Sequence, residues 1–186
     1  MSDRWNFLLL IPILAFVGLA PATPGRIAQH IVDPRTETIT MHWMNDSDRV
    51  YGNIGTLRST VEQQGKKLLF AMNGGMYTMD HAPVGLYVEQ GETLKPIDRR
   101  TEGYGNFFMQ PNGVFGITED RRAFVMRADA FKPAKTIAFA TQSGPMLLAD
   151  GTINAQFKQG SKNVQIRNGV GSFLMVVCSS PFRGIL

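Results

Sequence analysis

The sequence contains a single cysteine, Cys178, among its 186 residues. One cysteine permits no internal disulfide and no zinc site of the Cys-x-x-Cys kind, which excludes small disulfide scaffolds and zinc fingers. Charged residues are also scarce, at 18% of the chain, whereas 44% of the residues are hydrophobic. Such a chain can bury a core and has few charges to keep it unfolded, so intrinsic disorder is excluded as well.

The net charge is small. Nineteen Lys and Arg residues against 15 Asp and Glu residues give +4. This excess is too low for a dedicated nucleic-acid binder of this size, and we expect no nucleic-acid partner. Nineteen glycines and ten prolines without a period exclude collagen and predict many turns. One domain is the default at this length.

The common catalytic signatures are missing. His30, His42 and His81 lie too far apart for a pair of metal ligands on one helix, and there is no Gly-x-x-x-x-Gly-Lys phosphate loop. The Gly-x-Gly at Gly103 and Gly105 lacks the third glycine of a dinucleotide site. A nucleotide or zinc enzyme is not expected, no metal ligands are assigned, and the cofactor is left open.

Residues 1–22 have the pattern of a secretory signal peptide. Arg4 and the free amine precede an apolar run from Phe7 to Ala20, and Ala20-Pro21-Ala22 has the A-x-A spacing of a cleavage site. A bilayer span would need about 20 apolar residues, which this run does not reach. We expect cleavage after Ala22, with retention as a membrane anchor as the alternative. The mature chain would then be periplasmic or secreted without a stable membrane span, and the lack of a cysteine pair favours a bacterial periplasm.

Apolar runs of strand length dominate the rest of the chain. Strands are predicted at 38–44, 68–72, 84–89, 106–109, 114–118, 123–127 and 136–141. One helix is predicted at 55–65, with Thr56 as its N-cap and Gly65 closing its end, and a short turn at 128–131. Asp150-Gly151 predicts a two-residue hairpin. The expected fold class is a β-rich α+β domain with few helices.

Four of the apolar runs lead directly into a short polar segment that contains glycine. These polar segments are 73–75, 110–113, 141–144 and 167–171. Each would expose backbone N–H groups that glycine allows a ligand to approach closely. If the segments converge, they form a neutral, donor-rich pocket for a sugar or an oxyanion. Arg167 would add a planar charged group suited to phosphate or carboxylate.

Each polar segment also has a structural alternative. Asn112-Gly113 matches a common hairpin turn, and Arg167 fits a structural ion pair equally well. A Ser143 nucleophile would need a base, and its own segment holds no histidine or lysine, so a hydrogen-bonding role is favoured.

The nearby carboxylates are few. Asp150 lies in the predicted hairpin turn, and Glu89 and Glu92 flank a turn at 90–91. Asp80, just past the glycine pair, is therefore the carboxylate that we single out as a catalytic candidate.

In their order, these segments resemble the phosphodiester glycosidase family, long described as a domain of unknown function. That family includes the lysosomal enzyme that removes N-acetylglucosamine from mannose 6-phosphate diesters. The resemblance rests on 70–77, 82–87, 105–115, 140–147 and 166–171 and covers about residues 34–171. The chain looks like an exported bacterial member.

The resemblance implies a hydrolase that cleaves the bond between a sugar's anomeric carbon and a phosphodiester oxygen, in a fold with mixed sheets. It places Arg167 on the phosphate charge, and Asn73 and Asn168 on sugar hydroxyls or phosphate oxygens. The other implied pocket residues are Gly74, Gly75, Gln142, Ser143, Gly144 and Gly169, with 141–144 as a turn that shapes the wall. The partner would be a small molecule or glycan that bears a phosphodiester. Because phosphate is a fairly good leaving group, neutralising its charge would matter more than strong acid catalysis.

The tail, 172–186, does not resemble the family's continuation, which includes an Asp-Gly-Gly-like segment. The expected organisation is a signal peptide at 1–22, a glycosidase-like domain at 23–171 that is incomplete at its C-terminus, and an atypical tail. A frameshift or an early stop is our leading explanation. If the late aspartate is catalytic, activity would be weak or absent, so the alternative function is a non-catalytic exported module that binds a sugar or an anionic glycan.

Overall fold

The structure is a computed structural model that describes residues 28–162 and 165–173. The fold lies within a compact unit that begins at Ile31. The predicted signal peptide, Cys178 and most of the predicted tail lie outside the described residues. In the part that is described, no helix is long and apolar enough to cross a membrane.

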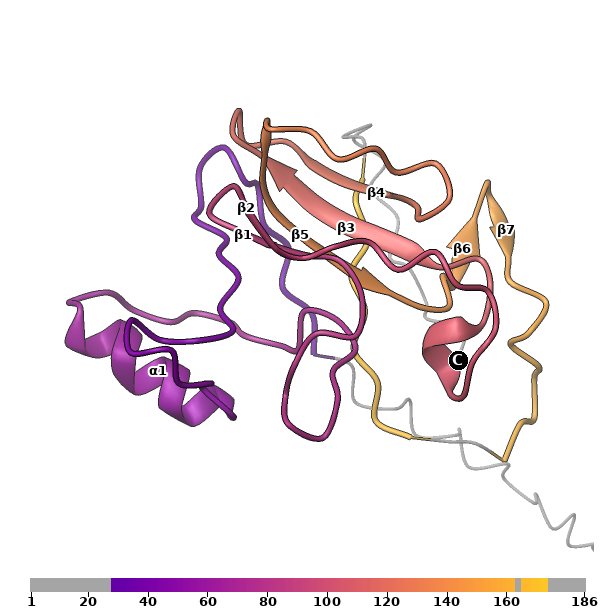
Figure 1. The fold of residues 1–186 in the computed structure, drawn as a ribbon, viewed down its shortest axis with the longest axis horizontal. Coiled ribbons are helices and arrows are strands. Elements are labelled where there is room, and N and C mark those ends of the chain that lie inside the picture. The colour runs from indigo at the N-terminus through magenta and orange to yellow at the C-terminus, as the bar shows by residue number, and fades with distance from the viewer. Residues whose placement is uncertain (1–27, 163–164, 174–186) are drawn as a thin grey trace, which may run out of the picture. The chain divides into compact units, whose positions relative to one another are not determined.

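A five-stranded antiparallel sheet forms the centre of the fold (Figure 1), with the strand order β2-β1-β5-β3-β4. Its strands are β1 (Tyr87–Glu89), β2 (Glu92–Lys95), β3 (Gly113–Thr118), β4 (Ala123–Arg127) and β5 (Ile137–Ser143). β6 (Leu148–Ala149) and β7 (Thr152–Ile153) form a separate hairpin. The prediction of a β-rich domain with few helices is confirmed. The pairings between the described strands are all antiparallel, so the mixed strand directions that the resemblance implied are not found there.

Strand β5 lies between the β1–β2 hairpin and the β3–β4 hairpin. On one side it pairs with β1, where Tyr87 lies opposite Thr141. On the other side it pairs with β3 along its whole length, from Gly113 opposite Ser143 to Thr118 opposite Ile137. The end of β5 therefore brings together segments from both halves of the domain.

The two faces of the sheet are distinguished by the alternation of side chains along β5. Ala140 and Gln142 point to one face, which we call the Gln142 face, and Thr141 and Ser143 point to the other, the Thr141 face. The hydrophobic core lies on the Gln142 face. Its buried residues are Leu86, Val88, Val114, Ala128, Phe131, Ile137 and Ala140. Burying one large aliphatic or aromatic side chain of this kind contributes about 1.5–3 kcal/mol.

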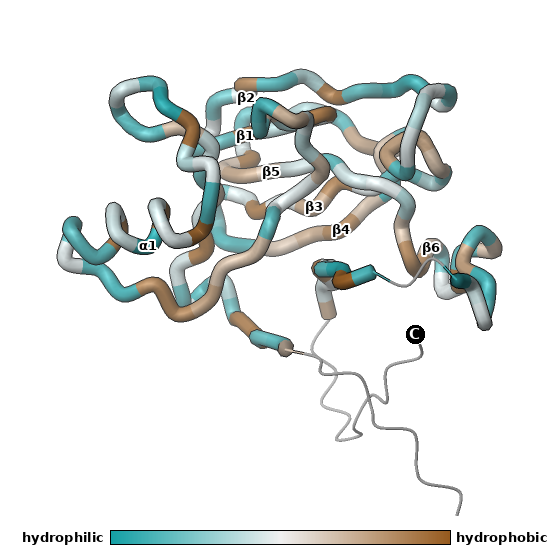
Figure 2. The backbone as a smooth tube through the Cα atoms, turned by 90° about the horizontal axis from the view of Figure 1, so that it is seen from below, coloured by the Kyte–Doolittle hydropathy of each residue, from teal (hydrophilic) through white to brown (hydrophobic). Residues whose placement is uncertain are grey.

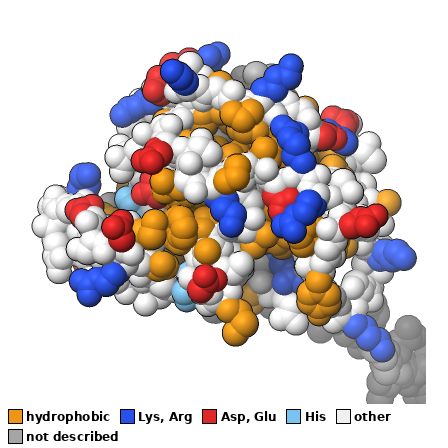
Figure 3. Space-filling model, in the orientation of Figure 1, with side chains coloured by type: hydrophobic (Ala, Val, Ile, Leu, Met, Phe, Trp, Pro, Cys, Tyr) orange, Lys and Arg blue, Asp and Glu red, His pale blue; other side chains and the backbone are white. Residues whose placement is uncertain are grey.

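Hydropathy distinguishes the central sheet from the helix. In Figure 2 the strands β3, β4 and β5 are largely pale to brown, whereas α1 (Ile54–Gln63) is mostly teal and white and buries none of its residues. On the face drawn in Figure 3, Lys and Arg side chains are interspersed with Asp and Glu. The basic residues seen there do not gather into one patch.

The predicted helix is present, but its cap differs. Asn53 is the N-cap, because its Oδ1 accepts a hydrogen bond from the Thr56 N–H at 2.9 Å. The assignment of Thr56 as the cap was therefore wrong: asparagine is an equally good cap and precedes the first turn. Gly65, with φ of +71°, follows the helix end as expected.

Three predicted strands are not strands. Segment 38–44 contributes only an isolated bridge from Met44 to Val50, 68–72 is irregular, and 106–109 begins as the 3-10 helix η1 (Asn106–Phe108). An apolar run can also be buried without joining a sheet, as Phe107 is. By contrast, β3, β4, β5 and the turn at 128–130 lie where predicted, and Asp150-Gly151 forms the expected hairpin turn with φ of 51° and 75°.

Glu89 anchors an N-terminal segment to the Thr141 face. Its Oε2 accepts hydrogen bonds from the Tyr87 hydroxyl at 2.8 Å and from the Trp43 N–H at 3.3 Å. The rings of Trp43 and Tyr87 meet edge to face at 6.1 Å. Burial, and then the bond to Glu89, raise the pKa of Tyr87 far above its usual range.

This raised pKa predicts a loss of stability at high pH. Tyrosine in the unfolded chain ionises near pH 10, while Tyr87 in the fold stays protonated. Its contribution is complete below about pH 10 and is lost as the pH rises further. We expect the free energy of unfolding, measured with urea between about pH 8 and pH 11, to fall more steeply for the wild type than for Tyr87→Phe. Tyr104→Phe, at a fully exposed site, should behave like the wild type, and equal slopes for all three proteins would contradict the prediction.

Candidate functional site

Four of the five motif segments meet at the C-terminal end of β5. A β-carbon on Gly75 would lie 2.9 Å from the carbonyl oxygen of Gln142, and one on Gly85 would lie 2.7 Å from the Phe107 ring. A β-carbon on Gly144 would lie 2.7 Å from the Phe107 carbonyl oxygen. Only glycine permits backbones to approach this closely. These glycines therefore mark the places where 70–77, 82–87, 105–115 and 140–147 pack together.

The alternation of β5 divides the predicted pocket residues between the two faces. Gly74 and Gly75 lie against Thr141, on the face to which Ser143 also points. Gln142 points to the opposite face, against Gly85. Residues 141–143 were expected to form a turn that shapes one wall, but they belong to a strand. Gln142 and Ser143 thus serve different sides of the sheet.

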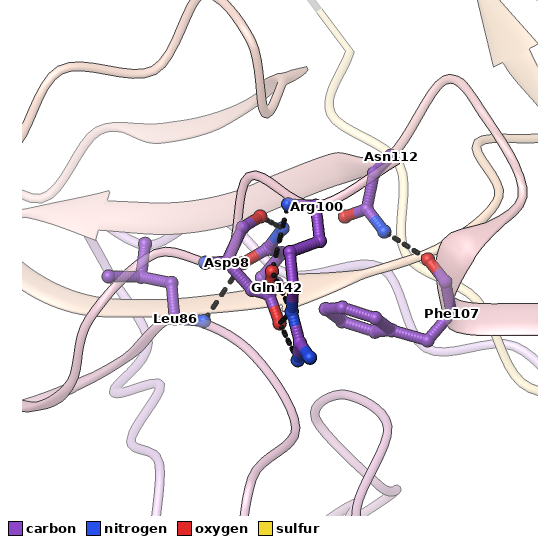
Figure 4. Close-up of polar contacts among 6 residues, drawn as sticks. All are labelled: Leu86, Asp98, Arg100, Phe107, Asn112 and Gln142. Carbon is purple, nitrogen blue, oxygen red and sulfur yellow. Dashed lines mark hydrogen bonds and ion pairs between the residues drawn. The ribbon is translucent and has the colours of Figure 1, made fainter. Parts of the chain in front are cut away.

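Gln142 is the hub of its face (Figure 4). The residue is only 1% exposed, and its Oε1 accepts hydrogen bonds from the N–H groups of Leu86 at 3.0 Å and Asp98 at 2.9 Å. Its Nε2 donates to the carbonyl of Asp98 at 2.6 Å. The amide thus ties β5 to two other segments. As placed, it serves the protein's own main chain and presents almost no surface to a ligand.

Asn112 supports the same face. It is 5% exposed, and its side-chain Nδ2 donates to the backbone carbonyl of Phe107. Its backbone carbonyl accepts a hydrogen bond from the Ala128 N–H at 2.8 Å. Gly113, the next residue, begins β3. The alternative reading of Asn112-Gly113 as a hairpin turn is therefore wrong. Asn112 holds η1 against the start of the strand.

Arg100, which the sequence did not single out, lies beside these segments. The Asp98 carboxylate accepts hydrogen bonds from Nε of Arg100 at 3.1 Å and from its Nη2 at 2.6 Å. These bonds are the largest cause of a lowered Asp98 pKa. The Arg100 guanidinium also lies over the Phe108 ring, 5.2 Å from its centre. One feature of the sequence could have pointed to this cation: residues 98–100, an aspartate and two arginines, stand just before the motif segment 105–115.

Asn73 lies on an exposed surface at the other face. Its Nδ2 donates to the Tyr77 hydroxyl at 3.4 Å, and the Tyr77 ring stacks on His81 with 5.7 Å between the ring centres. Asn73, Gly74 and Tyr77 are exposed and Ser143 is half-buried. This surface offers an amide, a hydroxyl and an aromatic ring, which are groups that bind sugars.

Asp80 lies at the tip of a tight turn. It accepts a hydrogen bond from the Thr78 hydroxyl, which also accepts from the Ala82 N–H at 3.2 Å. His81 follows in the left-handed region, with φ of 63°. The Thr78 bond is the largest cause of a lowered Asp80 pKa, so this carboxylate stays ionised. A general acid needs the opposite shift.

The chain contains a second copy of this turn. Asp120 accepts from the Thr118 hydroxyl, Thr118 accepts from the Arg122 N–H at 3.0 Å, and Arg121 has φ of 60°. This second turn merely connects β3 to β4. The geometry around Asp80 is thus accounted for by turn formation, and Asp120 is a natural control for it.

The fifth motif shows none of the close glycine packing found at the β5 end. Arg167, Asn168 and Gly169 lie on an exposed irregular segment, 165–173, and a β-carbon on Gly169 would meet no atom within 4 Å. Among the described residues there is no group of three or more His, Cys, Asp and Glu side chains that could hold a metal ion.

Comparisons with known proteins agree with the ordered motifs. The model of the phosphodiester glycosidase family matches residues 66–180, which include part of the tail set apart above. The chain is 39% identical over 167 residues to the uncharacterized protein YigE of Escherichia coli (strain K12), across 88% of this chain and 65% of that protein. No solved structure matches the chain. The chain belongs to the phosphodiester glycosidase family, as the sequence motifs predicted.

Replacing the hub residue should unfold this end of the sheet. In Gln142→Leu, two N–H groups and one carbonyl lose their buried partner, and each unpaired group costs about 1–3 kcal/mol. We therefore expect the free energy of unfolding, measured with urea, to fall by at least about 3 kcal/mol. Gln63→Leu, on the exposed surface of α1, should stay within about 0.5 kcal/mol of the wild type. A similar small loss in both variants would refute the role of Gln142.

Proposed function

We propose that the chain is an exported hydrolase that cleaves the bond between sugar C1 and the phosphodiester oxygen of a sugar 1-phosphodiester. The observation that supports this most directly is the meeting of four family segments at the end of β5, where glycines at 75, 85 and 144 permit close backbone approach. Membership of the family supports a substrate in which a sugar is linked through a phosphodiester.

The two faces suggest a division of roles. On the Thr141 face, Asn73 and Ser143 would bind sugar hydroxyls, with N–H groups of the Gly74-Gly75 segment beside them. The Gln142 face would hold the segments in place. In the reaction, a water oxygen bonds to C1 while the C1–oxygen bond breaks, and the electron pair leaves with the phosphate. The proton that the water loses passes to the departing phosphate or to solvent. A cation near the leaving oxygen would stabilise that charge, and Arg167 is the proposed cation, with Asn168 and Gly169 beside it.

The role of Asp80 is limited by its environment. Because the Thr78 hydroxyl lowers its pKa, Asp80 would act as a base or nucleophile and not as a proton donor. The alternative function, an exported module that binds a sugar or anionic glycan without turnover, is favoured by one observation: the turn that holds Asp80 recurs at Asp120.

An activity assay with paired variants tests both functions. We expect the purified chain to release free sugar from a sugar 1-phosphodiester. A catalytic Asp80 predicts that Asp80→Asn lowers kcat/KM at least about 100-fold, while Asp120→Asn, which removes the same turn contact, leaves it within about twofold.

The outcomes separate the alternatives. Equal effects of the two variants would show that Asp80 only forms its turn. Binding of the phosphodiester by the wild type with no release of sugar would overturn the hydrolase and favour the binding module.

A further inference from the structure

Arg100 is fixed in place through three successive contacts. The Gln142 amide binds both the N–H and the carbonyl of Asp98, so the backbone of Asp98 is tied to β5. The Asp98 carboxylate, only 11% exposed, then accepts hydrogen bonds from two guanidinium nitrogens of Arg100, Nε and Nη2. The guanidinium also lies over the Phe108 ring. Figure 4 shows the hub amide, the carboxylate and the arginine lying together.

A second ion pair in the chain shows what is particular about Arg100. Asp33 and Arg35 have the same spacing and bonding pattern, with Nε at 3.0 Å and Nη2 at 2.8 Å from the carboxylate. The Asp33 side chain is 34% exposed, more than that of Asp98. The backbone carbonyl of Asp33 accepts a hydrogen bond from the N–H of Glu37, four residues along the chain. That pair is a local surface contact, whereas the pair at Arg100 is tied to the centre of the sheet.

The guanidinium of Arg100 still has an open edge. Its Nε and Nη2 face Asp98, and in the described part of the chain no hydrogen bond reaches Nη1. The side chain is 69% exposed. A planar guanidinium with a free edge matches the geometry of phosphate oxygens. Arg100 is thus held on one side and available on the other.

The neighbourhood contains a second cation and a glycine-rich loop. The charge of Lys95 contributes, as a minor cause, to the lowered pKa of both Asp80 and Asp98. The exposed Gly103-Tyr104-Gly105 stretch leads into η1, and Gly105 has φ of 98°. The carboxylate that faces Arg100 is that of Asp98, which is already paired with it.

We infer that Arg100 forms an anion subsite for a phosphate or phosphodiester group, with Asp98 and Gln142 as its positioning residues. The sugar-binding groups proposed above lie on the Thr141 face, whereas Gln142 points to the opposite face, so this subsite is distinct from the place of the scissile phosphate. The subsite lies beside two motif segments, because Asp98 shares the Gln142 amide with Leu86 and Arg100 lies over the Phe108 ring. Arg167 lies on the exposed segment 165–173.

Calorimetric titration with inorganic phosphate and with dimethyl phosphate tests the subsite without any turnover. We expect Arg100→Gln to weaken the binding of both anions at least about tenfold, as the loss of a charged hydrogen bond predicts. Arg35→Gln, which removes the matched arginine, should change binding less than about twofold. Arg100→Lys should fall between Arg100→Gln and the wild type, because it keeps the charge and loses the planar edge.

The inference is overturned if the wild type binds neither anion, if Arg100→Gln binds as the wild type does, or if Arg167→Gln alone abolishes binding. Circular dichroism of Arg100→Gln shows whether the variant is folded, and Arg100→Lys replaces it if it is not. Failure of the proposed function can be told apart from failure of the subsite. Anion binding that depends on Arg100, with no release of sugar, keeps the subsite and overturns the hydrolase, whereas release of sugar by a wild type that binds neither anion keeps the hydrolase and overturns the subsite.

Discussion

The buried amide of Gln142 is the contact on which the rest of the structure depends. β5 lies between the β1–β2 and β3–β4 hairpins, and the amide at its end binds Leu86, 56 residues away, and Asp98, 44 residues away. A glutamine side chain supplies both an acceptor and a donor, so it can replace the ladder partners that these irregular segments lack. Because the surroundings exclude water, these bonds are costly to break.

The candidate site follows from this constraint. With Leu86 and Asp98 tied to β5, Gly75 and Gly85 lie within contact distance of the strand. Gly144, which follows the strand, lies against Phe107 and Asn112. Strand alternation then assigns opposite tasks to successive residues: Gln142 holds the segments together, while Thr141 and Ser143 face the surface that carries Asn73. The same amide fixes Asp98, so the position of Arg100 is also set by β5.

Local signals predicted the parts of the fold that local physics decides. β3, β4 and the Asp150-Gly151 hairpin follow from alternation and turn chemistry, and they lie where expected. Segments 38–44, 68–72 and 106–109 have the same apolar character, but whether they pair depends on long-range packing that no short window contains. The candidate site was likewise predictable only in part. The ordered motifs revealed the family, whereas the faces of Gln142 and Ser143, and the anchoring of Arg100, required the strand register.

Hydrogen exchange of two backbone amides in the native protein tests the central role of Gln142 most directly. The N–H groups of Leu86 and Asp98 share one acceptor, Oε1 of Gln142. If the amide holds both segments, the two N–H groups exchange slowly and open together, with the same free energy, close to that of global unfolding. An Asp98 N–H that exchanges as fast as the exposed N–H of Glu102, while the Leu86 N–H stays protected, would contradict the account.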